Sequence, residues 1–118
     1  MSEGDLRQSL EKIKSPRILV VGDLILDYYS WGKVDRISPE APIPVMRVLR
    51  EDRRLGGAGN VVMNLTTLGA EVFVCGVTGK DETGEYILKL LAENGVDHSG
   101  VIISENYKSC LKHRMIAG

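Results

Sequence analysis

Charge of one sign, long apolar runs and cysteine are all scarce in this chain of 118 residues, and each scarcity excludes a class of protein. Its 15 basic and 16 acidic residues leave a formal net charge of −1, so it lacks the basic excess with which nucleic-acid binders neutralise phosphates. Its longest apolar runs, Ile18–Val21 and Val72–Cys75, are far shorter than the roughly 20 residues of a membrane-spanning helix. Its 2 cysteines do not form a disulfide scaffold. We therefore expect a cytoplasmic protein that binds neither nucleic acid nor a membrane.

Hydrophobic periodicity predicts alternating helices and strands within one α/β unit. A short amphipathic helix over residues 3–14 precedes a β-branched run at 17–22, which is typical of a strand buried on both faces. The remaining expected elements are helices over 60–68 and 82–94, the second capped by Asp81, and strands over 71–77, 101–103 and 110–116. This alternation favours a largely parallel sheet.

The stretch from residue 28 to 49 has a different residue pattern. Three prolines within the six residues 39–44 exclude both a helix and a central strand there. We interpret 28–49 as a β-rich flap around a proline-stiffened connection, followed by a charged turn at Arg50–Arg54. Gly56 and Gly57 are then expected to form a glycine loop that opens the next helix.

Two familiar nucleotide-binding patterns are incomplete in this sequence. A P-loop aligned on Gly79-Lys80 would have Val74 in place of its first glycine and Asp81 in place of its serine or threonine. A dinucleotide fingerprint begun at Gly57-Ala58-Gly59 would have Val62 as its third glycine, and it follows charged residues instead of a buried strand. Neither pattern predicts a nucleotide site.

The stronger candidates are side chains suited to binding hydroxyl groups. Asp23 and Asp27 follow the first strand, where ligand sites of open α/β sheets gather, and ionised carboxylates accept strong hydrogen bonds from sugar hydroxyls. Gly56 and Gly57 would allow a ligand close to the backbone at a helix start, and the Asn60 amide could bind a hydroxyl or cap that helix. Spacing alone leaves a tight turn and a capping carboxylate open as alternatives.

A basic pair stands near the end of the chain. In the strand expected at 110–116, alternation places Lys112 and Arg114 on one face and His113 on the other. Two cations on one face can clamp a phosphate, or they can simply be solvated. The histidines and cysteines show no spacing typical of metal ligands, so no metal site is expected.

Several of these segments, taken in order, resemble the N-terminal half of ribokinase-like (PfkB-type) carbohydrate kinases, from about Ile18 to the end of the chain. The matching segments are Ile18–Asp23 with Asp27 and Tyr28, Gly56–Val61, and Val77–Asp81 with Gly84. The stretch Ile37–Val45 narrows the resemblance to the kinase domain of bacterial heptose 7-phosphate kinases of ADP-heptose synthesis, which occur alone or fused to an adenylyltransferase.

The resemblance implies a Rossmann-like αβα sandwich with a small β-lid, at about 28–49 here, that often forms a homodimer interface. It implies transfer of the γ-phosphoryl group of ATP, with Mg²⁺, to O1 of D-glycero-D-manno-heptose 7-phosphate in lipopolysaccharide synthesis. The positions that match the family's sugar site are Asp27 with Asp23 beside it, and Gly56, Gly57 and Asn60. Lys112 and Arg114 match a basic pair that we expect to hold the 7-phosphate. Gly59 stands where related kinases commonly have alanine.

One part of the family pattern is missing from this chain. These kinases carry, late in the chain, a Gly-Ala-Gly-Asp segment whose aspartate takes the proton of the sugar hydroxyl. The segment Gly57–Asn60 imitates it, but it comes early and ends in an amide. We therefore expect residues 1–118 to be the N-terminal part of one kinase domain, without catalytic residues and inactive alone. A kinase for another sugar, or a non-catalytic sugar-binding or dimerising lid module, are the alternatives.

Overall fold

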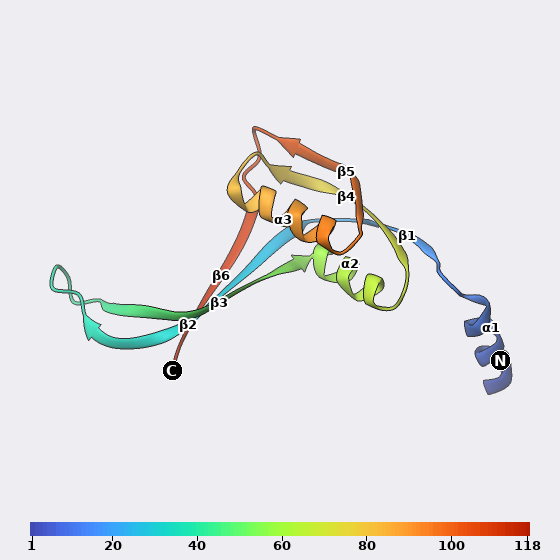
Figure 1. The fold of residues 1–118 in the computed structure, drawn as a ribbon, viewed down its shortest axis with the longest axis horizontal. Helices are drawn as coiled ribbons and strands as arrows, with labels where there is room; N and C mark the ends of the chain where they lie inside the picture. The colour runs from blue at the N-terminus through green and yellow to red at the C-terminus, as the bar shows by residue number, and fades with distance from the viewer.

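The computed structural model describes residues 1–118 as three helices and two three-stranded sheets (Figure 1). The elements in chain order are α1 (Glu3–Lys12), β1 (Arg17–Val21), β2 (Leu24–Ile37), β3 (Pro44–Gly57), α2 (Ala58–Thr67), β4 (Glu71–Gly79), α3 (Glu82–Glu93), β5 (Asp97–Ser104) and β6 (Cys110–Ala117). The body sheet has the order β1-β4-β5 and is parallel throughout, and the lid sheet has the order β3-β2-β6. The predicted α/β architecture with a parallel sheet is confirmed.

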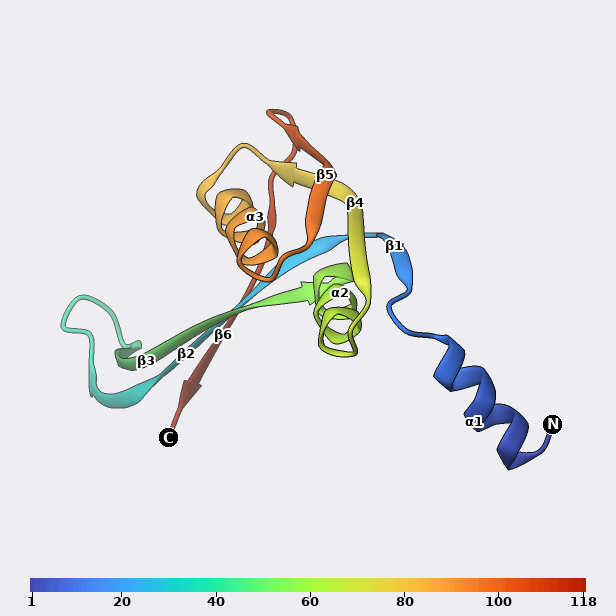
Figure 2. The same cartoon turned by 45° about the vertical axis from the view of Figure 1, so that its right-hand side comes forward.

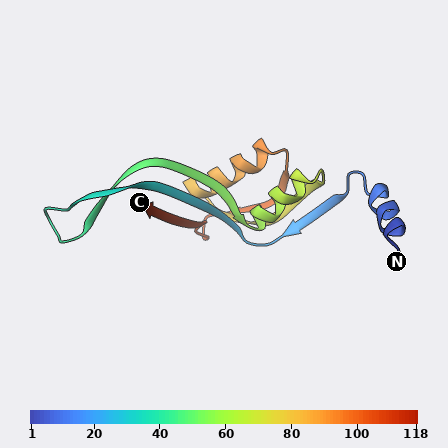
Figure 3. The same ribbon diagram turned by 90° about the horizontal axis from the view of Figure 1, so that it is seen from below.

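Both body helices, α2 and α3, cover the same face of the body sheet, as Figure 3 shows from below. Alternation along β4 turns Val72 and Val74 toward these helices, where they form one buried cluster with Val62, Ile87 and Leu91. Val96 also belongs to this cluster. The lid completes it with three residues near the body ends of β2 and β3, namely Leu24, Leu26 and Leu55. The core therefore lies where the lid joins the body.

The opposite face of the body sheet is apolar and uncovered. Leu19 and Val21 of β1 lie on it with exposed fractions of 60% and 72%, and Ile102 of β5 is 64% exposed. The prediction that the first strand is buried on both faces is wrong for these residues, because β1 is an edge strand and helices cover only one of its faces.

The lid sheet is a long antiparallel ribbon with a third strand along its inner half. β2 and β3 have 14 residues each and pair from Leu24↔Gly57 to Ile37↔Pro44, with irregular register near Trp31 and Val34. β6 runs parallel to β2, from Ile25↔Cys110 to Gly32↔Ala117. The β-rich structure thus extends beyond the expected 28–49 at both ends.

Two local expectations for the lid are corrected by this pairing. Arg50–Arg54 is not a turn, because it lies in the middle of β3 and pairs with Trp31–Asp27. Gly56 and Gly57 do not form a loop either, because they are the last residues of β3 and α2 begins directly after them.

The molecule is elongated because the lid and α1 both project from the body (Figure 2). Its radius of gyration is 19.5 Å, against about 13–14 Å for a compact chain of this length. The N-terminus of helix α1 is capped by a reciprocal capping box between Ser2 and Asp5, but none of the residues of this helix is buried. No helix is both long and apolar enough to cross a membrane.

Candidate substrate-binding site

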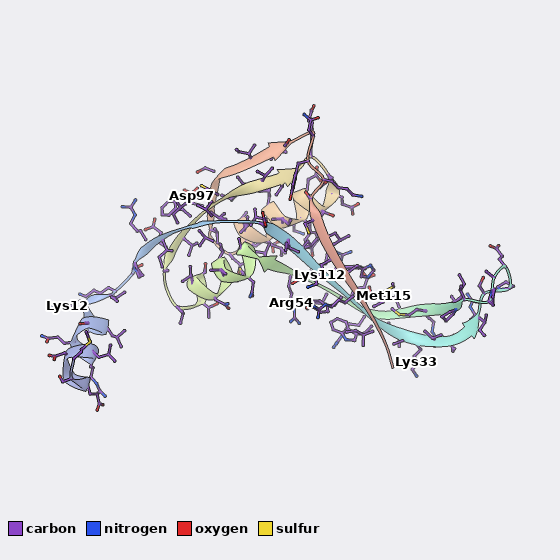
Figure 4. The ribbon with its side chains drawn as sticks, turned by 180° about the vertical axis from the view of Figure 1, so that it is seen from behind. Lys12, Lys33, Arg54, Asp97, Lys112 and Met115 are labelled. Carbon is purple, nitrogen blue, oxygen red and sulfur yellow. The ribbon has the colours of Figure 1, made fainter.

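Strand register gathers the candidate residues on one face of the lid sheet. Asp27 of β2 pairs with Arg54 of β3 on one side and with Lys112 of β6 on the other. In the next row on the same face, Tyr29 pairs with Asp52 and Arg114. Figure 4 labels Arg54 and Lys112, which flank β2 at this level of the lid. We call this surface, formed by Asp27, Tyr29, Asp52, Arg54, Lys112 and Arg114, the Asp27 face.

The two glycines that end β3 make room for this arrangement. A Cβ atom on Gly56 would lie 2.5 Å from Oδ2 of Asp27, so only glycine lets the carboxylate lie against the backbone there. Gly57 has φ +58°, a conformation that favours glycine, and its Cβ would lie 2.5 Å from the Asp23 carbonyl oxygen. That carbonyl accepts a hydrogen bond of 2.8 Å from the Ala58 N–H, which fixes the start of α2 beside β2.

Asp27 and Asn60 both line a hollow of about 460 Å³ between β2, β3, α2 and α3. Its nine lining residues are Asp27, Tyr29, Arg53, Arg54, Leu55, Asn60, Met63, Leu90 and Asn94. No side chain caps the N-terminus of α2, so the alternative that Asn60 caps this helix is not realised. Asn60 therefore remains, with Asp27, a residue of the wall of this hollow.

Other predicted residues lie around the hollow instead of in its wall. Asp23 contributes its backbone carbonyl to the start of α2, and its side chain does not line the hollow. Lys112 and Arg114 are on the same lid face as Asp27, but β2 separates them from the hollow. The structure thus brings Asp27, Gly56 and Asn60 together at the hollow and leaves the basic pair on its far flank.

Arg54 is the residue of this site that the sequence does not reveal, because the charged run Arg50–Arg54 predicts a turn. Its Nε donates to Oδ2 of Asp52 at 2.6 Å, and its guanidinium carbon lies 5.5 Å from the centre of the Tyr29 ring. The guanidinium carbon of Arg114 lies 6.0 Å from the same ring. Two arginines therefore approach Tyr29, one from each neighbouring strand.

The opposite face of the lid ties β6 to β2 and the lid to the body. Ser30, which is almost completely buried, is 2.8 Å from Nε2 of His113, and the rings of Tyr28 and His113 are 4.2 Å apart. The Arg53 guanidinium lies 4.3 Å from the Tyr28 ring and 5.3 Å from the Tyr86 ring of α3. The predicted placement of His113 opposite Lys112 and Arg114 is confirmed by this register.

The turn at Gly79–Asp81, which superficially matches a P-loop, uses its polar groups within the protein. Asp81 caps α3 as predicted by accepting from the Gly84 N–H at 2.8 Å, and it also accepts from the Ser109 N–H at 2.9 Å. Ser109 Oγ in turn accepts from the Gly79 N–H at 2.7 Å. The hydrogen bonds from Ser109 and Gly84 lower the pKa of Asp81 below its ordinary value. We call these hydrogen bonds among Gly79, Asp81, Gly84 and Ser109 the clasp. The clasp joins the end of β4, the start of α3 and the segment that leads into β6.

The model of the pfkB family of carbohydrate kinases matches residues 15–118, and the chain belongs to that family. The curated relative called Bifunctional protein HldE from Helicobacter pylori (strain ATCC 700392 / 26695) is 54% identical over 101 residues, which are 86% of this chain and 22% of that protein. The HldE protein of Pelobacter propionicus is 44% identical over 117 residues, 99% of this chain and 24% of that protein. The chain thus spans about a quarter of the length of these relatives.

Solved carbohydrate kinases have the same fold. A fructokinase from Xylella fastidiosa superposes with a TM-score of 0.64 at 26% identity, covering 82% of this chain and 27% of that one. The ribokinase from Cryptococcus neoformans var. grubii serotype A, solved in complex with ADP, gives a TM-score of 0.62 at 22% identity over 88% of this chain and 31% of its own. The predicted ribokinase-like fold class is therefore confirmed.

Proposed function

We propose that these residues form the sugar-binding and lid part of an ATP-dependent kinase that phosphorylates O1 of D-glycero-D-manno-heptose 7-phosphate in the cytoplasm. Membership of the pfkB family supports the reaction, and the similarity to HldE proteins supports the heptose. The observation that carries the proposal is the Asp27 carboxylate, which lies against Gly56 at a hollow shared with Asn60. The hollow has the size of a small-molecule site.

In this proposal the Asp27 face binds both ends of a phosphorylated sugar. The Asp27 carboxylate accepts hydrogen bonds from sugar hydroxyls, and the Asn60 amide binds a further hydroxyl. Lys112 and Arg114 attract the 7-phosphate, because they lie on the same face one strand away. This cationic flank favours heptose 7-phosphate over a free sugar as substrate.

ATP is the proposed phosphoryl donor, as in the fructokinase from Xylella fastidiosa that was solved with bound ATP. The Gly79–Asp81 turn does not fit its phosphates, because the Gly79 N–H donates to Ser109 and the Lys80 N–H donates to the Ser104 carbonyl. We assign neither ATP nor Mg²⁺ to residues 1–118. We expect these residues by themselves to show no turnover of ATP.

The lid also supports a proposed homodimer. Its outer half exposes apolar side chains of both long strands, including Val34, Ile37 and Leu49. Such residues on a projecting ribbon fit a second copy of the same ribbon. Sedimentation of the full-length protein should show a dimer that Leu49→Lys dissociates, and a monomer at all concentrations would overturn this proposal.

Steady-state kinetics of the full-length protein test the proposed reaction. Asp27→Asn should lower kcat/KM for heptose 7-phosphate about 10- to 100-fold, because a charge-assisted hydrogen bond to the sugar is lost. Asp35→Asn is the matched control, since Asp35 lies farther out on β2. Its carboxylate forms an ion pair with Arg47, with 3.3 Å between Oδ2 and Nη2. Equal or better turnover of free fructose or ribose would overturn the proposed substrate.

A further inference from the structure

Arg54 has a position that neither Lys112 nor Arg114 has. It lies on the Asp27 face like those two residues, but it also lines the hollow that Asp27 and Asn60 share. Its side chain is 66% exposed, so a ligand in the hollow can reach it. An anionic group on a sugar held at Asp27 could therefore reach Arg54 from the β3 side of the site.

The ion pair with Asp52 orients the Arg54 guanidinium without using all of it. Asp52 and Arg54 are alternate residues of β3 on one face, and the carboxylate accepts from Nε at 2.6 Å. The two terminal nitrogens of Arg54 have no hydrogen-bond partner or ion pair within the chain. An arginine fixed through Nε presents its planar terminal edge, which is the geometry that binds two phosphate oxygens together.

Tyr29 provides the place where such a phosphate would lie. The guanidinium carbons of Arg54 and Arg114 are 5.5 Å and 6.0 Å from its ring centre, on opposite flanks of β2. Tyr29 is the next residue after Asp27 on this face, and successive residues on one face of a strand are about 6.6 Å apart. A sugar hydroxyl at Asp27 and a terminal phosphate held beside Tyr29 by the guanidiniums of Arg54 and Arg114 would therefore fit one elongated phosphosugar.

From this juxtaposition we infer that Arg54, positioned by Asp52, binds the phosphate of the sugar substrate from the β3 side, opposite Lys112 and Arg114. The inference rests on the proposed function and adds to it the residue that closes the phosphate site next to the hollow. Three cations on two strands then surround a dianion, and preference for a phosphorylated over a free sugar depends on Arg54.

Calorimetry and kinetics on the full-length protein, with heptose 7-phosphate and unphosphorylated heptose as probes, test this role. Arg54→Ala should raise Kd and KM for heptose 7-phosphate about 10- to 100-fold and leave the Kd of free heptose unchanged. Arg54→Lys should keep part of the affinity, since it retains the charge and loses the planar edge. Arg50→Ala is the matched control, because Arg50 is on the same strand and face but lies 4.0 Å over Trp31, away from the hollow.

Asp52 needs a separate test, because it acts through Arg54. Asp52→Asn should raise KM for heptose 7-phosphate without changing kcat, and it should have no further effect when combined with Arg54→Ala. Additive effects of the two substitutions would overturn the positioning role of Asp52.

The outcomes separate this inference from the proposed function. Wild-type affinity of Arg54→Ala for heptose 7-phosphate, with the loss in Asp27→Asn retained, overturns the role of Arg54 alone. An equal loss of both sugars in Arg54→Ala also overturns it, because the phosphate would then not be the group that Arg54 binds. Failure of the wild-type protein to bind or phosphorylate heptose 7-phosphate overturns the proposed function itself.

Discussion

Gly56→Ala is the most direct perturbation of the site, because it adds a single carbon beneath the Asp27 carboxylate. The added Cβ would lie 2.5 Å from Oδ2, 2.8 Å from Cγ and 3.0 Å from Oδ1 of Asp27. All three atoms belong to the side chain of Asp27, so the overlap falls on the carboxylate group itself. The carboxylate must move as a whole, or β2 and β3 must separate at this point.

The size of the effect follows from these distances. Ordinary contacts between heavy atoms begin at about 3.5 Å, so the carboxylate must shift by about 1 Å. A displacement of that size in a substrate-positioning group reduces the rate about 100-fold, which corresponds to about 2.7 kcal/mol of transition-state stabilisation. Overpacking should also lower the free energy of unfolding by about 1–3 kcal/mol.

The assay compares kcat/KM for heptose 7-phosphate with the free energy of unfolding in urea, both on the full-length protein. Gly100→Ala is the matched control, because its Cβ would lie 2.5 Å from Sγ of Cys75 in the body sheet, away from the hollow. It should destabilise the protein to a similar extent and leave kcat/KM unchanged. Unchanged kcat/KM in Gly56→Ala, or an equal loss in Gly100→Ala, would refute the argument that the position of Asp27 governs sugar binding.

Three further predictions concern stability and are measured by urea denaturation. Gly57→Ala should lower the free energy of unfolding by about 1–3 kcal/mol, since φ is +58° there; an unchanged midpoint would contradict this. The lowered pKa of Asp81 makes its carboxylate stabilising above the ordinary value of 3.8, and this contribution is lost as pH falls through the lowered pKa. Asp81→Asn should therefore be less stable than wild type at pH 7 and should lose less stability on acidification, whereas parallel pH profiles would refute the clasp with Ser109. Ser30→Ala should cost about 0.5–1.5 kcal/mol because the hydrogen bond between Ser30 Oγ and Nε2 of His113 is lost, and protection of β6 amides in hydrogen exchange should fall first.

The elements of the body could be predicted from sequence because their patterns are local. The apolar stripe of α3, its Asp81 cap and the β-branched runs of β4 and β5 all lie close to where the structure has them. The sequence predicts two buried faces for β1, because its continuous apolar run is typical of a central strand. Nothing in residues 1–118 covers its second face. A local residue pattern does not predict whether a distant part of the chain covers a strand.

The lid strands could be predicted only in part, because a projecting ribbon has no deeply buried face along most of its length. The charged run at Arg50–Arg54 was therefore interpreted as a turn, although its side chains alternate between the two faces of β3. A residue expected in a turn is not a site candidate, so the sequence does not identify Arg54. Asp27 and Asn60 could be proposed as site residues from the sequence because their signals, a carboxylate after the first strand and a polar residue at a helix start, are local ones.

One of the three lid strands that form the Asp27 face, β6, comes from a distant part of the chain, and this has a thermodynamic consequence for binding. β6 has only β2 as a strand neighbour, and its side chains are exposed, so few contacts of its own hold it in place. A phosphosugar that contacts Asp27 on β2, Arg54 on β3 and Lys112 on β6 would bind only when all three strands are paired. Part of the binding free energy would then appear as stabilisation of the lid, in proportion to RT ln(1 + [L]/Kd). Amides of β6 should therefore gain more protection from hydrogen exchange with heptose 7-phosphate than amides of α3, and equal gains would show that the lid is already fully ordered without ligand.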